Sequence, residues 1–150
     1  MFGFGNSAAK ILNGVWSYND LLIRECRLLS TYRHSKVPVE KKRSDLSRTI
    51  AVITNVINDL GKVKAKVKNQ PECLRLVEKL QKRSQRMAVK INELINIVKD
   101  GEPDNWNKFK SKAESLQEPY AFRQDLLKLI EEMRKNPENK VEKDWKRKAA

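Results

Sequence analysis

The sequence has very little histidine and cysteine, two of the residues from which enzyme and metal sites are most often built. Of its 150 residues, one is histidine and two are cysteine. His34 stands alone at the end of a predicted helix, while Cys26 and Cys73 have no further ligands at metal-site spacing. No phosphate-binding loop, dinucleotide fingerprint or nucleophile elbow occurs. We therefore predict that the chain is not an enzyme and that it uses no cofactor and no metal.

Long hydrophobic runs and targeting signals are also missing. The longest uncharged run, residues 49–58, is far shorter than the ~20 residues that span a bilayer. The N-terminal sequence MFGFGNSAAKILNGVW has neither the charged start nor the apolar stretch of a secretory signal, and Phe2 stands where myristoylation requires glycine. The two cysteines are interpreted as buried free thiols. We expect a cytoplasmic protein that can be recruited to a membrane.

What the sequence does contain is helical periodicity. Apolar residues recur at alternating three- and four-residue steps in residues 7–34, 38–68 and 73–98, which is the spacing of one helix face. The three stripes are Ala8, Ile11, Val15, Tyr18, Leu22, Cys26 and Leu29; Leu46, Ile50, Ile53, Ile57, Leu60 and Val67; and Cys73, Val77, Leu80, Ser84, Met87, Ile91, Leu94 and Val98. The alternation that is typical of strands is absent.

Few prolines and glycines occur, and they mark the expected helix ends. Pro38 and Pro71 suit the first turn of a helix, Gly101 suits the end of the third helix, and Asp104 suits the cap of the fourth. Pro119 interrupts the fourth apolar stripe, so we expect a kink or a short break near Glu118. That stripe comprises Trp106, Phe109, Ala113, Leu116, Leu126, Ile130 and Met133.

These segments predict an all-α fold. Because short connections make successive helices antiparallel neighbours, we expect an antiparallel up-down four-helix bundle over residues 1–135, with a kinked fourth helix. Residues 136–150 are expected to form a short basic helix or tail, with Val141 and Trp145 as anchors. One continuous core is expected to bury Leu46, Ile50, Ile53, Ile57, Val77, Leu80, Met87, Ile91, Leu94, Leu126 and Ile130.

Acidic residues are scarce relative to basic ones, 19 against 32, which gives a net charge of +13. Residues 41–90 hold 14 Lys or Arg and only 4 Asp or Glu. Lysines can simply solvate helix faces, but a solvating surface usually mixes signs, whereas concentrated charge of one sign commonly marks an anionic partner. The predicted anion-binding residues are Lys41, Lys42, Arg43, Lys62, Lys64, Lys66, Lys68, Arg75, Lys79, Lys82, Arg83 and Arg86.

The aromatic residues help to choose the anion. No Phe, Tyr or Trp occurs between residues 33 and 105, which disfavours proteins that read single-stranded nucleic acid by stacking. Phe2 and Phe4, set between glycines, and Trp16 form a predicted membrane wedge. The alternative interpretation of this segment is a frayed terminus that leads into a core helix. An anionic phospholipid surface is therefore the preferred partner, ahead of nucleic acid.

Four features of the sequence carry a resemblance to a known family. Two are general, the basic helix surfaces and the apolar N-terminus. The other two are stretches: KVPVEKKRSDLSR at the start of the second helix and CLRLVEKLQKRSQRM in the third. The chain resembles the N-terminal killer domains of the mixed-lineage kinase domain-like proteins and the fungal HeLo proteins. The resemblance implies a four-helix bundle that forms homo-oligomers, meets anionic phospholipid through basic side chains and permeabilises the membrane. It transfers no individual functional residue.

Two other functions remain open from the sequence. The chain can be an adaptor bundle whose groove receives a helix of a protein partner, in which case exposed apolar residues matter more than the lysines. It can also be a bundle that coats nucleic acid through charge alone, without reading its sequence.

Overall fold

The computed structural model describes residues 7–29, 38–103, 105–139 and 141. Over these residues it contains α-helices and one short 3₁₀ helix, and no strand. The all-α prediction is therefore confirmed for the described chain. The helices are α1 (Ala8–Leu29), α2 (Val39–Lys66), α3 (Pro71–Val98), α4 (Asn107–Glu114) and α5 (Glu118–Arg134), followed by the 3₁₀ helix η3 (Pro137–Asn139).

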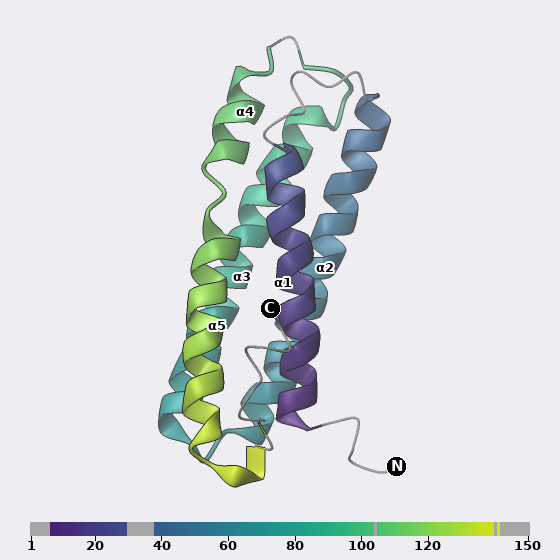
Figure 1. Ribbon diagram of the computed structural model, residues 1–150. Helices are drawn as coiled ribbons and strands as arrows, with labels where there is room; N and C mark the ends of the chain where they lie inside the picture. Colours follow the sequence, from purple (N-terminus) through teal and green to yellow (C-terminus); the bar gives the residue numbers. More distant parts are fainter. Residues whose placement is uncertain (1–6, 30–37, 104, 140, 142–150) are drawn as a thin grey trace.

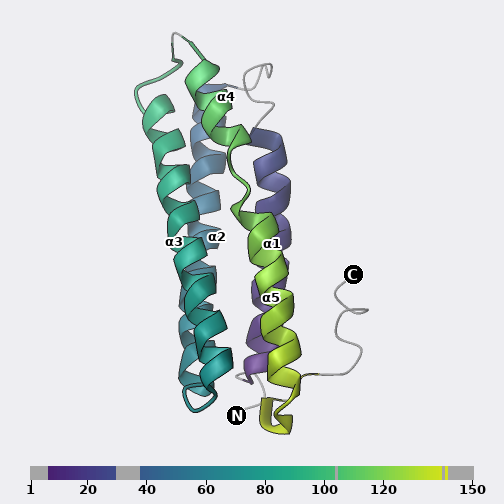
Figure 2. The same ribbon diagram turned by 90° about the vertical axis from the view of Figure 1, so that its left-hand side faces the viewer.

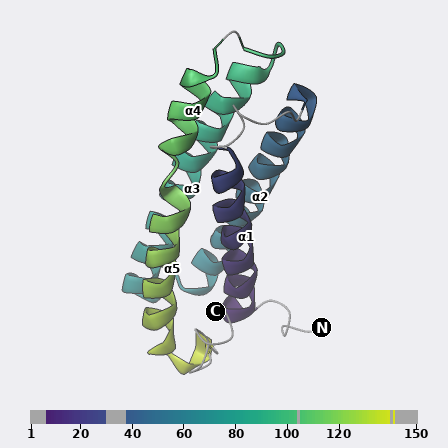
Figure 3. The same cartoon turned by 45° about the horizontal axis from the view of Figure 1, so that its top comes forward.

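The helices lie side by side in an elongated bundle (Figures 1 and 2). Helix α2 packs against α1 and α3, and α5 packs against α3 and α1, so these elements close around a common core. The start of α1, the turn between α2 and α3 and the end of α5 lie at the lower end of Figure 1. The end of α1, the start of α2 and helix α4 lie at the other end, which comes forward in Figure 3.

The segment that was predicted as one kinked fourth helix consists of two helices. Helices α4 and α5 follow one another in the same column of the bundle and are separated by residues 115–117 (Figure 2). Pro119 lies in the first turn of α5 and not in the interior of a helix. A missing N–H costs nothing there, and the Pro119 carbonyl accepts a hydrogen bond of 3.0 Å from Nδ2 of Asn19 on α1.

The other predicted helix ends are largely correct. Pro71 is the first residue of α3, whereas Pro38 immediately precedes α2 as its N-cap. Gly101 follows the end of α3 with a φ of 123°, a conformation that favours glycine. Asp104, the expected cap of the fourth helix, lies outside the described residues, but Asn105 Oδ1 accepts a 2.9 Å hydrogen bond from the Asn107 backbone N–H.

The core consists of two apolar clusters stacked along the bundle, and the prediction of one continuous core was wrong. The first cluster, which includes Ala8, Val67 and Met133, joins the first half of α1, the second half of α2, the first half of α3 and α5. The second, which includes Leu29, Val98 and Phe109, joins the opposite halves of α1, α2 and α3 to α4. The break between α4 and α5 therefore falls between the two clusters.

Four of the six residues predicted for the buried stripe of α2 are buried, but Ile50 and Ile57 are not. The buried residues are Val39, Lys42, Leu46, Thr49, Ile53, Val56, Leu60 and Val63, continued by Val67 after the helix. Ile50 and Ile57 are only partly buried at the side of this stripe. Thr49 can occupy the core because its hydroxyl donates a 2.9 Å hydrogen bond to the Asp45 carbonyl. The uncharged run 49–58 is therefore not all core, since it exposes Ala51, Thr54, Asn55 and Asn58.

The stripe of α3 was predicted correctly at every position. All eight residues from Cys73 to Val98 are buried, joined by Leu76. In α1, Ala8, Val15, Leu22, Cys26 and Leu29 are buried as expected, while Ile11 and Tyr18 pack at the edge. Cys26 and Cys73 are buried free thiols, as the sequence predicted.

A pair of amides fastens the end of α5 to the turn between α2 and α3. Gln70 Nε2 donates to Asn139 Oδ1 at 3.2 Å, and Asn139 Nδ2 donates back to Gln70 Oε1 at 2.8 Å. The same Asn139 amide nitrogen donates to the Met133 carbonyl at 2.9 Å. These bonds satisfy a buried side chain and fix the end of the bundle at which α2 turns into α3.

Candidate anion-binding surface

Seven of the predicted anion-binding residues gather at the lower end of the bundle in Figure 1, around the turn between α2 and α3. We call this group the basic end; it comprises Lys62, Lys64, Lys66, Lys68, Arg75, Lys79 and Lys82. Residues 62–82 contain these seven cations and only two carboxylates, Glu72 and Glu78. Such a local excess of positive charge attracts polyanions and raises their local concentration.

The α3 part of the basic end forms a shallow hollow. Arg75, Lys79 and Lys82 are spaced by four and three residues, so they lie on one side of α3. Together with Glu78 they line a hollow of about 300 Å³. Oε2 of Glu78 lies 3.5 Å from Nζ of Lys64 on α2, which ties the two helices together at this point. The hollow is therefore lined by three cations and one carboxylate.

A buried carboxylate on α5, that of Asp125, forms ion pairs with basic side chains of α3. The Asp125 side chain is 4 % exposed, and its Oδ2 accepts a 2.5 Å hydrogen bond from Nε of Arg83. Its Oδ1 lies 3.4 Å from Nζ of Lys79 and 3.9 Å from Nζ of Lys128. Arg83 thus serves mainly to pin α3 against α5, which Figure 2 shows side by side. Sequence reasoning missed Asp125, because no local pattern shows which cations on another helix a carboxylate will meet.

The remaining cations differ in how far protein carboxylates already neutralise them. Arg75 pairs with Glu72, and these hydrogen bonds lower the pKa of the Glu72 carboxyl and raise the pKa of Arg75. Lys62 Nζ lies 3.7 Å from Asp59 Oδ1. Lys66, Lys68, Lys82 and Arg86 are exposed and form no ion pair with any other described residue. These four cations are the most available for an external anion.

Lys41 and Arg43 do not belong to the basic end, because they lie at the start of α2, at the opposite end of the bundle (Figure 1). Lys41 Nζ forms an ion pair of 3.1 Å with Asp45. Arg43 Nη1 donates to the carbonyls of Val98 at 3.3 Å and Lys99 at 2.9 Å. Arg43 therefore caps the C-terminal end of α3, where carbonyls have no partner within the helix.

Lys42 was predicted to lie on the surface, and this prediction was wrong. Its side chain is only 1 % exposed, because position 42 continues the buried stripe four residues before Leu46. Its ammonium lies 4.3 Å from the ring centroid of Trp106, which is a cation–π contact. Lys42 therefore helps to hold the segment before α4 against α2 and is removed from the anion-binding surface.

Trp16 was predicted to be part of the membrane wedge, and this prediction was also wrong. Trp16 is 7 % exposed and belongs to the first core cluster, with the guanidinium of Arg123 stacked 4.7 Å from its ring centroid. A tryptophan held in this way is a core residue, as the alternative interpretation of the segment requires. Phe2 and Phe4 lie outside the described residues, as do His34 and Trp145.

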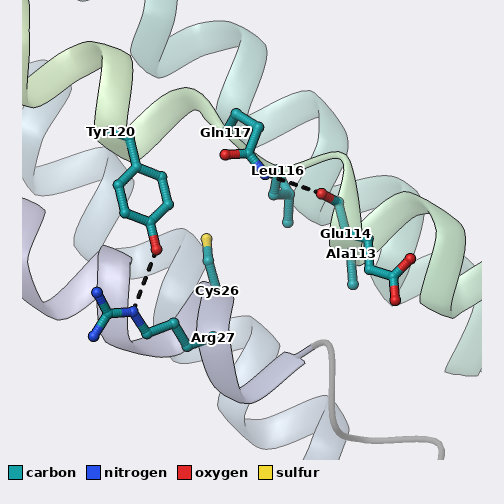
Figure 4. A pocket seen from close by; sticks show the side chains of 7 residues that line it. All are labelled: Cys26, Arg27, Ala113, Glu114, Leu116, Gln117 and Tyr120. Atoms are coloured by element: carbon teal, nitrogen blue, oxygen red, sulfur yellow. Dashed lines mark hydrogen bonds between the residues drawn. The ribbon is translucent and has the colours of Figure 1, made fainter.

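A second, smaller hollow lies at the break between α4 and α5, and the sequence did not predict it (Figure 4). It measures about 210 Å³ and is lined by Cys26, Arg27, Ala113, Glu114, Leu116, Gln117 and Tyr120. Arg27 Nε donates to the Tyr120 hydroxyl at 3.3 Å. Burial, then the charges of Glu118 and Glu25, raise the pKa of the Cys26 thiol to about 12. A thiol with this pKa stays protonated near neutral pH and is a poor nucleophile.

Within the described ranges, no three His, Cys, Asp or Glu side chains are grouped so that they could hold a metal ion. Among the same residues, no helix combines the length and the apolar character that a membrane span requires.

Comparisons with protein-family models, with curated proteins and with solved structures found no match. The resemblance to the killer domains therefore stays a prediction.

Proposed function

We propose that this chain is a non-enzymatic helical-bundle domain that binds anionic phospholipid membranes through its basic end. The observation that carries the proposal is the arrangement of seven cations and two carboxylates in residues 62–82, at one end of the bundle. Lys66, Lys68 and Lys82 project there without a described ion-pair partner. A membrane surface offers many phosphates in a plane, and each basic residue near such a surface contributes about 1 kcal/mol of binding free energy.

The directions in which the helices run would place the N-terminal end of the chain at the basic end. We propose that the helices run antiparallel, up-down-up-down, with α4 and α5 acting together as the broken fourth helix. Support comes from the two core clusters, because each joins opposite halves of successive helices. In this arrangement the start of α1 lies at the basic end. Phe4 is four positions before Ala8, so an N-terminal apolar segment would approach the same membrane surface.

As the resemblance implies, we further propose that the bound domain forms oligomers and permeabilises the membrane. Phe2 and Phe4 supply the apolar contribution in this proposal, and Trp16 does not, since it is buried in the core. Burial of aromatic rings in the interface adds a free energy that salt does not screen, whereas salt weakens the attraction of the basic end.

Co-sedimentation with vesicles tests the proposal. The protein should bind vesicles that contain phosphatidylserine and not vesicles of phosphatidylcholine alone, and binding should fall steeply as salt increases. Dye release from the anionic vesicles should follow binding, and a variant that lacks residues 1–5 should bind but release much less dye. Preferential binding to generic duplex DNA in the same buffer would favour the nucleic-acid function instead, and binding to neither anion would favour the adaptor function.

A further inference from the structure

The guanidinium of Arg134, the last residue of α5, is buried without a partner. Its Nε and Nη2 atoms are both buried, and neither has a hydrogen-bond partner in the part of the chain that the structure describes. Because a guanidinium carries its charge permanently, burying it without a counter-charge is strongly unfavourable. A buried arginine in this state therefore indicates a place that an anion fills.

The two unpaired nitrogens lie on one edge of the guanidinium. Nε–H and Nη2–H of an arginine point to the same side and form a fork that holds two oxygens of one oxyanion. Arg75 uses this edge elsewhere in the bundle, since its Nε lies 3.1 Å from each carboxylate oxygen of Glu72 and its Nη2 also donates to that carboxylate. On Arg134 the same edge meets no carboxylate among the described residues.

The fold places Arg134 beside the start of α1. Nη1 of Arg123, on α5, lies 3.8 Å from Oδ1 of Asp20 on α1. Arg134 follows Arg123 by eleven residues, which is three helical turns, so it lies on the same side of α5 about 16 Å further along. Ala8 and Met133 belong to the same core cluster, and Figures 1 and 2 show the start of α1 at the same end of the bundle as the end of α5.

The start of α1 adds further hydrogen-bond donors and no acidic side chain. The backbone N–H groups of Ala8 and Ala9 lie in the first turn, where no carbonyl of the same helix can accept them. The first turn holds no acidic residue, and the Ser7 hydroxyl oxygen accepts the Lys10 N–H at 3.2 Å. The N-terminus of a helix carries a partial positive charge that favours phosphate groups. This charge and the guanidinium therefore favour the same kind of ligand.

We propose that the fork of Arg134 and the first turn of α1 form a binding site for one phosphate group. Nε and Nη2 hold two of its oxygens, and the N–H groups of the first turn face a third. The site binds a single group at a fixed place, whereas the exposed cations of the basic end attract many phosphates in a plane. The inference goes beyond the proposed function, because the site binds a soluble phosphate without any membrane.

Thermal unfolding in inorganic phosphate tests the inference, at constant pH and at an ionic strength kept constant with chloride. At a phosphate concentration about ten times the dissociation constant of the site, the melting temperature of the parent protein should rise by about 3–6 °C. Arg134→Met removes the charge and the fork and should lose most of this rise. Arg24→Met removes the same charge from an exposed position of α1 and should keep the rise.

Vesicles identify the source of the phosphate group. Phosphatidic acid presents a phosphate monoester at the membrane surface, so a lipid ligand predicts that Arg134→Met adsorbs to vesicles containing it more weakly than Arg24→Met does. A soluble ligand predicts equal adsorption of the two variants, together with the difference in melting temperature. Loss of the phosphate effect with unchanged adsorption to phosphatidylserine vesicles separates this site from the basic end.

A second readout distinguishes a phosphate site from an arginine that only supports the fold. Without phosphate, Arg134→Met should melt no lower than the parent protein, since it removes an unpaired buried charge and methionine favours helix. Arg134→Lys should regain only a minor part of the phosphate effect, because an ammonium offers no planar fork. A parent protein that phosphate does not stabilise, equal rises in Arg134→Met and Arg24→Met, or a lower melting temperature of Arg134→Met without phosphate would each overturn the inference.

Discussion

Reversal of three lysines at the basic end, Lys66, Lys68 and Lys82 to Glu, is expected to weaken binding to phosphatidylserine vesicles by roughly a hundredfold. Each of these cations should contribute about 1 kcal/mol near an anionic surface, and a tenfold change in affinity corresponds to about 1.4 kcal/mol. All three are exposed, and none pairs with a carboxylate among the described residues, so their reversal breaks no ion pair there. Vesicle co-sedimentation at fixed salt measures the effect.

The matched control reverses three exposed cations outside the basic end, Arg24, Lys99 and Lys108. Both triple variants lower the net charge by six, from +13 to +7, so they differ in where charge is removed and not in how much. The control should lose less than about tenfold in affinity, because its reversed residues lie away from the lipid surface. Equal losses would mean that net charge alone drives binding and that the basic end has no special role.

Replacement of Asp125 by Asn is expected to destabilise the protein and, at the same time, to tighten anion binding. The neutral amide keeps the shape of the side chain but removes the charge that Arg83 contacts at 2.5 Å and Lys79 at 3.4 Å. The free energy of unfolding should fall by about 2 kcal/mol. This loss of stability is smaller than the usual loss on breaking a fully buried ion pair, because the Lys79 side chain is 41 % exposed and can be rehydrated.

Of the three cations that pair with Asp125, Arg83 and Lys79 would become available to lipid phosphates, so affinity for anionic vesicles should rise about tenfold. Glu102→Gln is the control, since it removes one negative charge from an exposed residue in the loop after α3. Chemical denaturation and vesicle co-sedimentation measure the two effects on the same samples. A destabilised variant with unchanged affinity would show that Asp125 has only a structural role.

The sequence predicted α3 completely because every position of its stripe is apolar or small and the four-three repeat is unbroken from Cys73 to Val98. In α2 the choice between Thr49 and Ile50, or between Val56 and Ile57, could not be made from hydrophobicity alone. The observed stripe depends on a hydroxyl that bonds to its own helix at Asp45. Lys42 was misplaced for a related reason, since its ammonium is held by Trp106 from a distant segment.

The sequence predicted where the basic end lies in the chain, but not which of its cations are free of ion pairs with protein carboxylates. The density of Lys and Arg in residues 62–82 was evident, and the turn between α2 and α3 brings them together. Which of them are neutralised depends on Glu78 and Asp125, whose positions against Lys64 and Arg83 follow from packing between helices. Of the two outcomes predicted near Glu118, a kink or a short break, the structure has the break, at residues 115–117 between α4 and α5.

The central claim, that the basic end faces the membrane, is tested most directly by a polarity-sensitive fluorophore at either end of the bundle. Asn69→Cys places a thiol at the basic end, and Asn107→Cys places one at the start of α4, both at exposed positions. The native thiols should label slowly, because burial raises the pKa of Cys73 and raises that of Cys26 to about 12. With phosphatidylserine vesicles the probe at position 69 should shift to the blue, while the probe at position 107 should not. A shift at position 107 alone, or equal shifts at both positions, would contradict the account.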